Sequence, residues 1–145
     1  MCRLLFALWF ALAAGAASLQ ARGGGGCVAE GTLIDTPNGP RAIESLQVGD
    51  AVWSQVAGQR VGAQVQAVYQ VAPAEFIELT TSDTTLLVTA EHPVQTDTGV
   101  FVRADHLAEA TNLFTPTART PLTRFRHVAA DRPAYNLLVS PGGVF

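Results

Sequence analysis

One cysteine and one Thr/His pair are the residues of this chain whose types and spacing could do chemistry. Cys27 follows four consecutive glycines, and Thr89 and His92 occur later in a Thr-x-x-His pattern. A thiol can attack a carbonyl carbon, and histidine exchanges a proton near neutral pH because its ordinary pKa is about 6.5. We therefore predict that the Cys27 thiol attacks the carbonyl of the unhindered Gly26. The pair of Thr89 and His92, brought alongside by the fold, would polarise the Gly26–Cys27 bond and protonate the departing amide nitrogen.

Each of these residues also has an ordinary structural interpretation. Free cysteine is among the most buried residue types, so Cys27 could be an inert thiol at the start of a strand. His92 could be a loop histidine that satisfies a backbone carbonyl ahead of Pro93, and Thr89 could be a hydroxyl on the surface of a strand. A lipid-bearing cysteine is a further alternative for Cys27, although the glycines before it match lipoprotein signals poorly.

The N-terminal segment resembles an export signal. Arg3 supplies the positive charge, residues 4–17 form an apolar run, and small residues such as Ala21 offer cleavage sites. The run is shorter than the roughly 20 apolar residues that span a membrane, although an uncleaved anchor remains an alternative. We predict a helical signal peptide over residues 1–21 and an exported protein, periplasmic or secreted, that meets the membrane only through this segment.

Removal of the signal would leave one thiol in the mature chain. Cys2 lies within the signal, so Cys27 has no partner for an internal disulfide. A lone thiol in an oxidising compartment is either buried or reactive. The position of Cys27 directly after the glycines favours the reactive interpretation.

The elements that must position these residues are short strands. Residues 22–26 form a glycine-rich linker, so we expect a single folded domain over residues 27–145. Segments rich in Val, Thr, Ile and Phe and bounded by turn residues predict strands at 28–36, 51–54, 62–71, 76–81, 84–88, 99–103, 122–128 and 134–139. Short helical turns are predicted at 42–48 and 105–107, and Asn38-Gly39 predicts a tight turn. The fold class is therefore all-β and compact.

Composition and spacing exclude several functions. The formal net charge is −3, and the nine cationic residues, all arginine, are scattered singly, so a nucleic-acid partner is not expected. The three histidines and Cys27 are too far apart in sequence for an ordinary structural zinc site, so neither a metal nor another cofactor is expected. No Gly-x-Ser-x-Gly pattern supports a hydrolase triad.

The remaining polar candidates are interpreted as structural residues. His106 and His127 carry no motif, and Asp50 is expected to pin a turn. The chain is expected to be a monomer.

Three blocks of the sequence resemble the Hedgehog/intein (Hint) autoprocessing domains, especially their bacterial intein-like members. The first block opens at Cys27, the second contains Thr89 and His92, and the third lies near the end of the chain. The matching segments are Cys27, Gly31-Thr32, Thr36-Pro37-Asn38-Gly39, Ile43-Glu44-Ser45-Leu46, Val48-Gly49-Asp50-Ala51-Val52, Thr89-Ala90-Glu91-His92-Pro93 and Tyr135-Asn136-Leu137-Leu138-Val139.

The resemblance implies a pseudo-symmetric, horseshoe-like all-β fold that brings both chain ends and the second block together. It also implies that Cys27 performs an N-to-S acyl shift, which converts the Gly26–Cys27 peptide bond into a thioester. The substrate is then the chain's own N-terminal segment, and an external thiol, an amine or water accepts the acyl group. Such a domain acts once on itself rather than as an enzyme with multiple turnovers.

The sequence departs from the splicing members of this family at its end. Those members finish in His-Asn, whereas this sequence stops at Phe145, so we expect a C-terminally incomplete domain whose splicing is lost. Asn136 stands where many inteins have Asp. A non-catalytic exported β-domain on a relic Hint scaffold is the main alternative, and an unrelated hydrolase or lipoprotein is the third.

Overall fold

The computed structural model describes residues 25–114, 119–143 and 145, and these form an almost entirely β structure. The expected signal peptide and most of the linker lie outside these residues. Helical structure in the described part consists of two single 3-10 turns, η1 (Ile43–Ser45) and η2 (Ala104–His106). The all-β expectation is therefore confirmed. A search of these residues for a helix of membrane-spanning length and hydropathy finds none.

The strands are mostly short and are paired antiparallel. Their bounds are β1 (Val28–Ala29), β2 (Leu33–Ile34), β3 (Arg41–Ala42), β4 (Ala51–Val56), β5 (Gln59–Val71), β6 (Glu75–Thr80), β7 (Thr85–Val88), β8 (Pro93–Gln95), β9 (Phe101–Arg103), β10 (Asn112–Phe114), β11 (Arg119–Pro121), β12 (Arg124–Ala129) and β13 (Ala134–Ser140).

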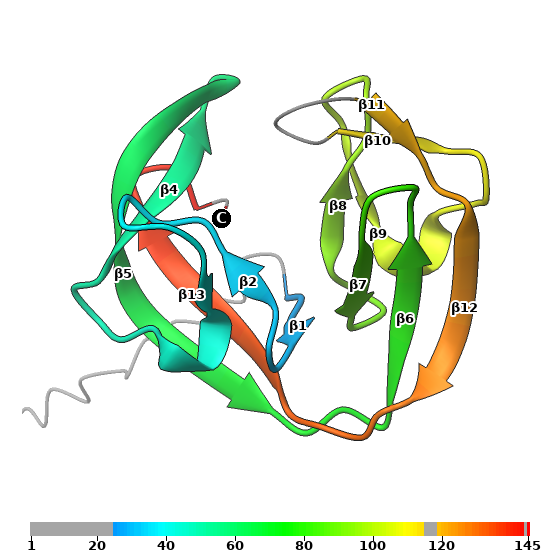
Figure 1. The fold of residues 1–145 in the computed structure, drawn as a ribbon, viewed down its shortest axis with the longest axis horizontal. Helices are drawn as coiled ribbons and strands as arrows, with labels where there is room; N and C mark the ends of the chain where they lie inside the picture. Colours follow the sequence, from blue (N-terminus) through cyan, green and yellow to red (C-terminus); the bar gives the residue numbers. More distant parts are fainter. Residues whose placement is uncertain (1–24, 115–118, 144) are drawn as a thin grey trace, which may run out of the picture.

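The shortest strand of the main sheet joins its two halves. The seven strands lie in the order β12-β6-β7-β1-β13-β5-β4, so β1 has three strands on each side. Val28 pairs with Val88 of β7 on one side and with Tyr135 of β13 on the other. The sheet bends into a horseshoe whose arms are β4–β5 with the upper part of β13, and β6–β7 with β12 (Figure 1). Three two-stranded sheets complete the fold: β2–β3, β8–β9 and β10–β11.

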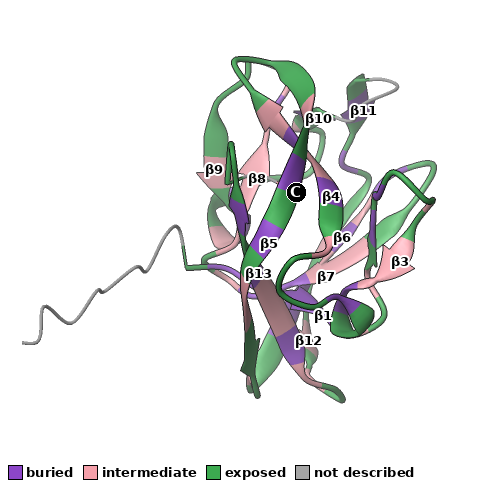
Figure 2. Cartoon of the chain, turned by 90° about the vertical axis from the view of Figure 1, so that its left-hand side faces the viewer, coloured by how far each residue is buried: buried purple, intermediate pink, exposed green. Residues whose placement is uncertain are grey.

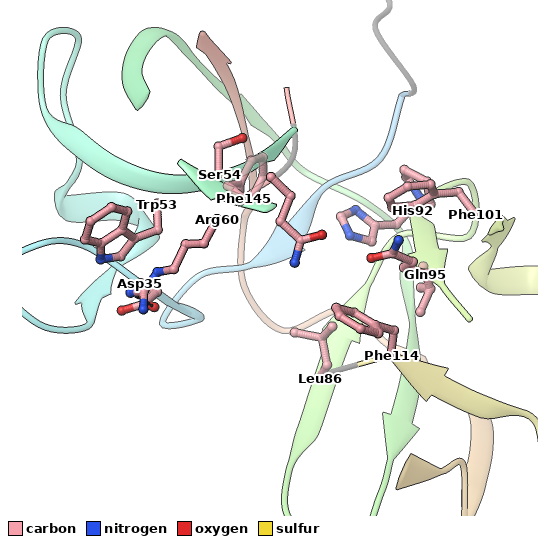
Figure 3. Close-up of a pocket in the computed structure, with 13 residues that line it drawn as sticks. Asp35, Trp53, Ser54, Arg60, Leu86, His92, Gln95, Phe101, Phe114 and Phe145 are labelled. Atoms are coloured by element: carbon pink, nitrogen blue, oxygen red, sulfur yellow. Dashed lines mark hydrogen bonds and ion pairs between the residues drawn. The ribbon is translucent and has the colours of Figure 1, made fainter. Parts of the chain in front are cut away.

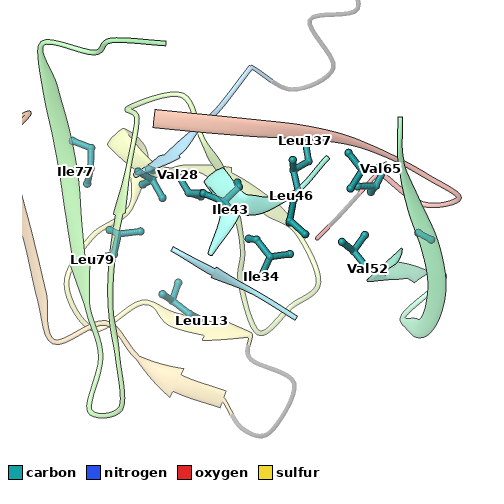
Figure 4. Packing of buried hydrophobic residues seen from close by; sticks show 14 of the residues in the cluster. Val28, Ile34, Ile43, Leu46, Val52, Val65, Ile77, Leu79, Leu113 and Leu137 are labelled. Atoms are coloured by element: carbon teal, nitrogen blue, oxygen red, sulfur yellow. The ribbon is translucent and has the colours of Figure 1, made fainter. Parts of the chain in front are cut away.

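The core fills the space between the arms. Burial alternates along β4, where Val52 and Ser54 are buried and their neighbours are more exposed, as expected for a strand with one face against the core (Figure 2). Ile43 of η1 is fully buried and packs in one cluster with Val65 from one arm and Ile77 from the other (Figure 4). Because residues from both arms share this cluster, it fixes the arms relative to each other.

The predicted continuous strand over residues 28–36 is wrong. The chain turns after Ala29, where the Thr32 amide donates a 3.1 Å hydrogen bond to the Ala29 carbonyl, and β2 then pairs with β3 outside the main sheet. A run of residues with high strand propensity does not reveal this turn, because propensity says nothing about which partner each segment pairs with.

Other local expectations are confirmed. The Gly39 amide donates to the Thr36 carbonyl at 3.0 Å with Gly39 at φ 98°, which is the left-handed conformation that the Asn-Gly pair predicts. The Asp50 carboxylate accepts the Gln47 amide at 2.9 Å and so pins the turn before β4. The helical segment predicted at 42–48 is confined to the single turn of η1.

Candidate active site

The three predicted site residues converge at the centre of the main sheet. Cys27 directly precedes β1, and Thr89 directly follows β7, the neighbouring strand. The hydrogen bonding between β1 and β7 extends to these two residues, because the Thr89 amide donates a 2.9 Å hydrogen bond to the Cys27 carbonyl. The pairing of β1 with β7 therefore brings together two sequence blocks that lie far apart in the chain.

Thr89 contacts the scissile peptide unit through its side chain. The Cys27 amide donates a 2.9 Å hydrogen bond to Thr89 Oγ1, and this bond is buried. The Cys27 nitrogen is the atom that would depart if the Gly26–Cys27 bond broke. The Thr89 hydroxyl is therefore in direct contact with the Gly26–Cys27 peptide unit.

His92 is held in place by its backbone. Its amide donates to the Thr89 carbonyl at 3.0 Å, which closes a tight turn, and its carbonyl accepts the Ala104 amide at 2.9 Å. The Asp105 amide donates to the Ala90 carbonyl at 2.9 Å, so η2 supports the turn from outside. The Thr-x-x-His spacing is therefore one turn of chain that presents both side chains to Gly26 and Cys27.

Gly26 lies directly against His92. A Cβ atom built on Gly26 would lie 2.2 Å from the His92 Cα, so the two main chains are in close contact. The Gly26 carbonyl lies near enough to the imidazole to act to raise the pKa of His92. The carbonyl that the thiol would attack is therefore adjacent to the residue that would transfer the proton.

The environment of His92 favours a neutral imidazole. Burial lowers the pKa of His92, while the Gly26 carbonyl and the charge of Glu91 act in the opposite direction. Nδ1 is buried and has no hydrogen-bond partner among the described residues. A buried polar atom without a partner is costly, and such atoms often mark functional sites. A neutral imidazole with an unpaired nitrogen can accept a proton and then deliver it.

The Cys27 thiol is held away from solvent. Cys27 is 8% exposed and packs in an apolar cluster with Ala29, Phe76 and Ala134. Burial raises the pKa of the thiol, and the charge of Glu91 raises it further. The resting side chain is therefore a neutral thiol, and its reaction requires a base or a higher pH.

A cleft of about 330 Å³ opens beside His92, between the two arms of the horseshoe (Figure 3). Trp53, Ser54, Gln55 and Arg60 line it from the β4–β5 arm. The opposite wall is formed by Leu86, Pro93, Val94, Gln95, Phe101 and Phe114. Phe145, the last residue of the sequence, also lines the cleft, which places the end of the chain beside the second sequence block as expected.

An ion pair supports the rim of this cleft. Arg60 pairs with Asp35 at 2.7 Å, and its guanidinium lies 4.2 Å from the centre of the Trp53 ring. Sequence analysis did not identify these residues as neighbours of the site. They carry no local motif, and their proximity arises only when β4 and β5 form their arm.

The other titratable candidates lie outside the site. His106 belongs to η2, and His127 lies on the edge strand β12 with its Nδ1 3.2 Å from Glu75. Their side chains are 67% and 55% exposed, so both have the structural positions that the sequence predicts. The side chain of Asn136 accepts the Leu137 amide at 2.9 Å and is engaged with its own strand.

Solved structures of inteins share this fold. An intein-like domain from Clostridium thermocellum superposes with a TM-score of 0.74 at 24% identity, covering 80% of this chain and 88% of that domain. The gp41-1 intein gives a TM-score of 0.68 at 23% identity, covering 81% of this chain and 89% of the intein. A DnaB intein from Synechocystis sp. PCC 6803 gives 0.72 at 19% identity, with coverage of 81% and 89%. No functionally curated protein sequence matches the chain.

The amino-acid sequence also matches a protein-family profile. The profile of the Hint domain matches residues 26–140, a range that begins at the glycine before Cys27 and runs to the end of β13. This match contains Cys27, Thr89 and His92 in the geometry described above. The chain belongs to the Hint domain family.

Proposed function

We propose that this Hint domain cleaves its own chain at the Gly26–Cys27 bond through an N-to-S acyl shift. One observation carries the proposal. The Cys27 amide nitrogen, which would be the leaving group, donates a hydrogen bond to Thr89 Oγ1, and Thr89 shares a tight turn with His92. Catalytic groups placed around the bond that breaks reduce the entropic cost of reaching the transition state.

The acyl shift exchanges one bond for another. The Cys27 sulfur forms a bond to the carbonyl carbon of Gly26, the bond from that carbon to the Cys27 nitrogen breaks, and a thioester remains. The thiol loses one proton and the amine gains one, so the step is balanced without an external reactant. His92 relays this proton, since its imidazole is neutral at rest and its Nδ1 has no partner among the described residues.

Thr89 acts on the leaving nitrogen. Its hydroxyl accepts the Cys27 N–H and so fixes the orientation of the scissile amide. When the amide becomes an amine, the same oxygen remains a hydrogen-bond acceptor for it. Thr89 thus favours the separated amine without exchanging a proton of its own.

The thioester is resolved by an external acceptor. A thiol, an amine or water attacks the Gly26 carbonyl carbon, the carbon–sulfur bond breaks, and the Cys27 thiol is regenerated. The cleft beside His92 gives such a molecule a route to the site from the open side of the horseshoe. The proposal is limited to cleavage at the N-terminal junction, without splicing.

A reporter fusion tests this function. A folded reporter is joined ahead of residue 22, and its release is followed by intact-mass spectrometry with and without hydroxylamine. We expect release that depends on hydroxylamine and leaves a hydroxamate on Gly26. Cys27→Ala should abolish it. Release that leaves no hydroxamate on Gly26 when hydroxylamine is present, or release that is unchanged in Cys27→Ala, would contradict the proposal.

A second function is favoured by the state of the thiol. The apolar cluster around Cys27 and its raised pKa also suit a relic scaffold that no longer reacts. In that case a well-folded fusion shows no release under any acceptor, and iodoacetamide modifies Cys27 slowly in the folded state and rapidly after denaturation. The same fusion therefore separates the two functions.

We also propose that the protein works outside the cytoplasm as a monomer. The apolar run at residues 4–17 supports export, and removal of residues 1–21 would leave Cys27 as the sole thiol. N-terminal sequencing of the exported protein and its mass in solution test these two points. A protein that retains residue 1 and stays in the cytoplasmic fraction, or a stable dimer, would contradict them.

A further inference from the structure

The residue before the nucleophile makes the tightest backbone contact of the site. A Cβ atom built on Gly26 would lie 2.2 Å from Cα of His92, 2.8 Å from its Cβ and 2.9 Å from its backbone nitrogen. Non-bonded carbon atoms approach to about 3.5–4.0 Å. An L-amino acid with any side chain therefore does not fit at position 26 in this arrangement.

The obstacle cannot move aside as a flexible side chain would. The atoms that would clash belong to the His92 main chain or are its Cβ. That main chain is held by two hydrogen bonds, from the His92 amide to the Thr89 carbonyl at 3.0 Å and from the Ala104 amide to the His92 carbonyl at 2.9 Å. Shifting them would break the turn that positions both Thr89 and His92. The preceding residue behaves differently, because a Cβ on Gly25 meets no atom within 4 Å.

We propose that this contact determines which acyl segments the domain releases: chains that end in glycine are accepted, and chains that end in any residue with a side chain are rejected. The inference rests on the proposed cleavage and specifies its substrate class. Position 25 is not restricted in this way, since a Cβ built on Gly25 meets no atom within 4 Å.

A side chain at position 26 would misalign the carbonyl of that residue with the Cys27 thiol and His92, in addition to weakening the contact with the His92 main chain. The carbonyl of Gly26 is the proposed target of the thiol, and it also lies near enough to the imidazole to act to raise the pKa of His92. A side chain at position 26 would push this carbonyl away from His92. Since displacing a reacting group by about 1 Å costs on the order of 100-fold in rate, even a methyl group should be strongly inhibitory.

Two matched alanine substitutions test the inference in the reporter fusion. Gly25→Ala should release the reporter within about 2-fold of the native rate, and Gly26→Ala should slow release by about 100-fold or more. Gly26→Val should release none. Release from Gly26→Ala within about 2-fold of native would overturn the inference while leaving the cleavage proposal intact.

A second measurement does not depend on cleavage. In a Cys27→Ala background, NMR titration of the His92 imidazole is compared for Gly26, Gly26→Ala and Gly25→Ala proteins. We expect Gly26→Ala to lower the titration midpoint, because the Gly26 carbonyl favours the protonated ring, and we expect Gly25→Ala to leave it unchanged. The amide spectrum shows whether each variant is folded. A folded Gly26→Ala protein with an unchanged His92 midpoint and unchanged neighbouring amide shifts would overturn the inference, whether or not the native fusion cleaves.

Discussion

The Cys27 amide donates a 2.9 Å hydrogen bond to Thr89 Oγ1, a residue 62 positions away in the chain. This bond satisfies the one backbone donor that lies within the scissile peptide unit itself. It therefore links Cys27, at the start of β1, to the turn that carries Thr89 and His92, and it provides the most direct test of how the site is assembled.

Thr89→Val removes the hydroxyl while keeping the branched shape. The Cys27 amide would then be buried without a partner, which costs about 1–3 kcal/mol of stability. We expect a corresponding drop in the free energy of unfolding, measured by urea denaturation, and slower reporter release because the leaving nitrogen is no longer oriented.

Thr89→Ser retains the hydroxyl and should preserve most of the release. Thr123→Val is a matched control, because Thr123 also uses its hydroxyl for a backbone hydrogen bond but lies outside the site. If Thr89→Val releases the reporter as fast as Thr123→Val, the role of the Thr89 hydroxyl in cleavage is wrong.

His92→Gln tests proton transfer. Glutamine can hydrogen-bond but cannot exchange a proton near neutral pH, so release should slow by about 100-fold or more. Burial lowers the pKa of His92, so replacing its neutral ring with a neutral glutamine introduces no buried charge. The variant should therefore remain folded, which circular dichroism can verify.

The exposed histidines are the controls for this change. His106→Gln and His127→Gln should release the reporter at the native rate, since both side chains are exposed and neither lines the cleft beside His92. An equal loss of rate in any of these controls would show that the effect of His92→Gln is not specific to the site.

The rate of release should rise with pH. Burial and Glu91 hold the pKa of Cys27 above its ordinary value of about 8.5, so the thiol is neutral at neutral pH and its reactive form increases as pH rises toward the raised pKa. The same shift means that the thiol contributes stability below the ordinary pKa, and that this stability is lost as pH rises through the folded-state pKa.

The measurement is the release rate between about pH 6.5 and pH 10 at a constant concentration of unprotonated hydroxylamine. A synthetic glycine thioester, treated in parallel, corrects for the pH dependence of the second step. We expect the corrected rate to keep increasing above about pH 8.5. A plateau reached near neutral pH would indicate a thiol of lowered pKa and contradict the electrostatic description of the site.

The cleft should limit the size of the acyl acceptor. Gln95 lines the cleft near His92 (Figure 3), and Gln95→Trp would fill part of its volume of about 330 Å³. Release by a bulky amine such as benzylamine should fall by about 10-fold or more, whereas release by hydroxylamine should change little.

Gln70→Trp provides the control for this substitution, because Gln70 is exposed on β5 and does not line the cleft. If both tryptophan variants respond alike to the two acceptors, the acceptor does not enter through the cleft.

The sequence by itself determined the features that depend on neighbouring residues. The Thr-x-x-His pattern became a single turn, Asn38-Gly39 became the expected tight turn, and Asp50 pins the turn before β4, because each depends on bonds between residues a few positions apart. The strand-rich class followed from composition, and the family resemblance identified Cys27, Thr89 and His92 as the set to examine.

Only the tertiary structure decided how these local features combine. The predicted strand over residues 28–36 was wrong because β1 pairs within the main sheet while β2 pairs with β3, and pairing partners are distant in sequence. The short strands β3, β8, β10 and β11 were not predicted, since two or three residues carry little periodic signal. The contact of Gly26 with His92, the cleft between the arms and the buried state of the Cys27 thiol likewise arise from long-range packing, which a local pattern of residues does not specify.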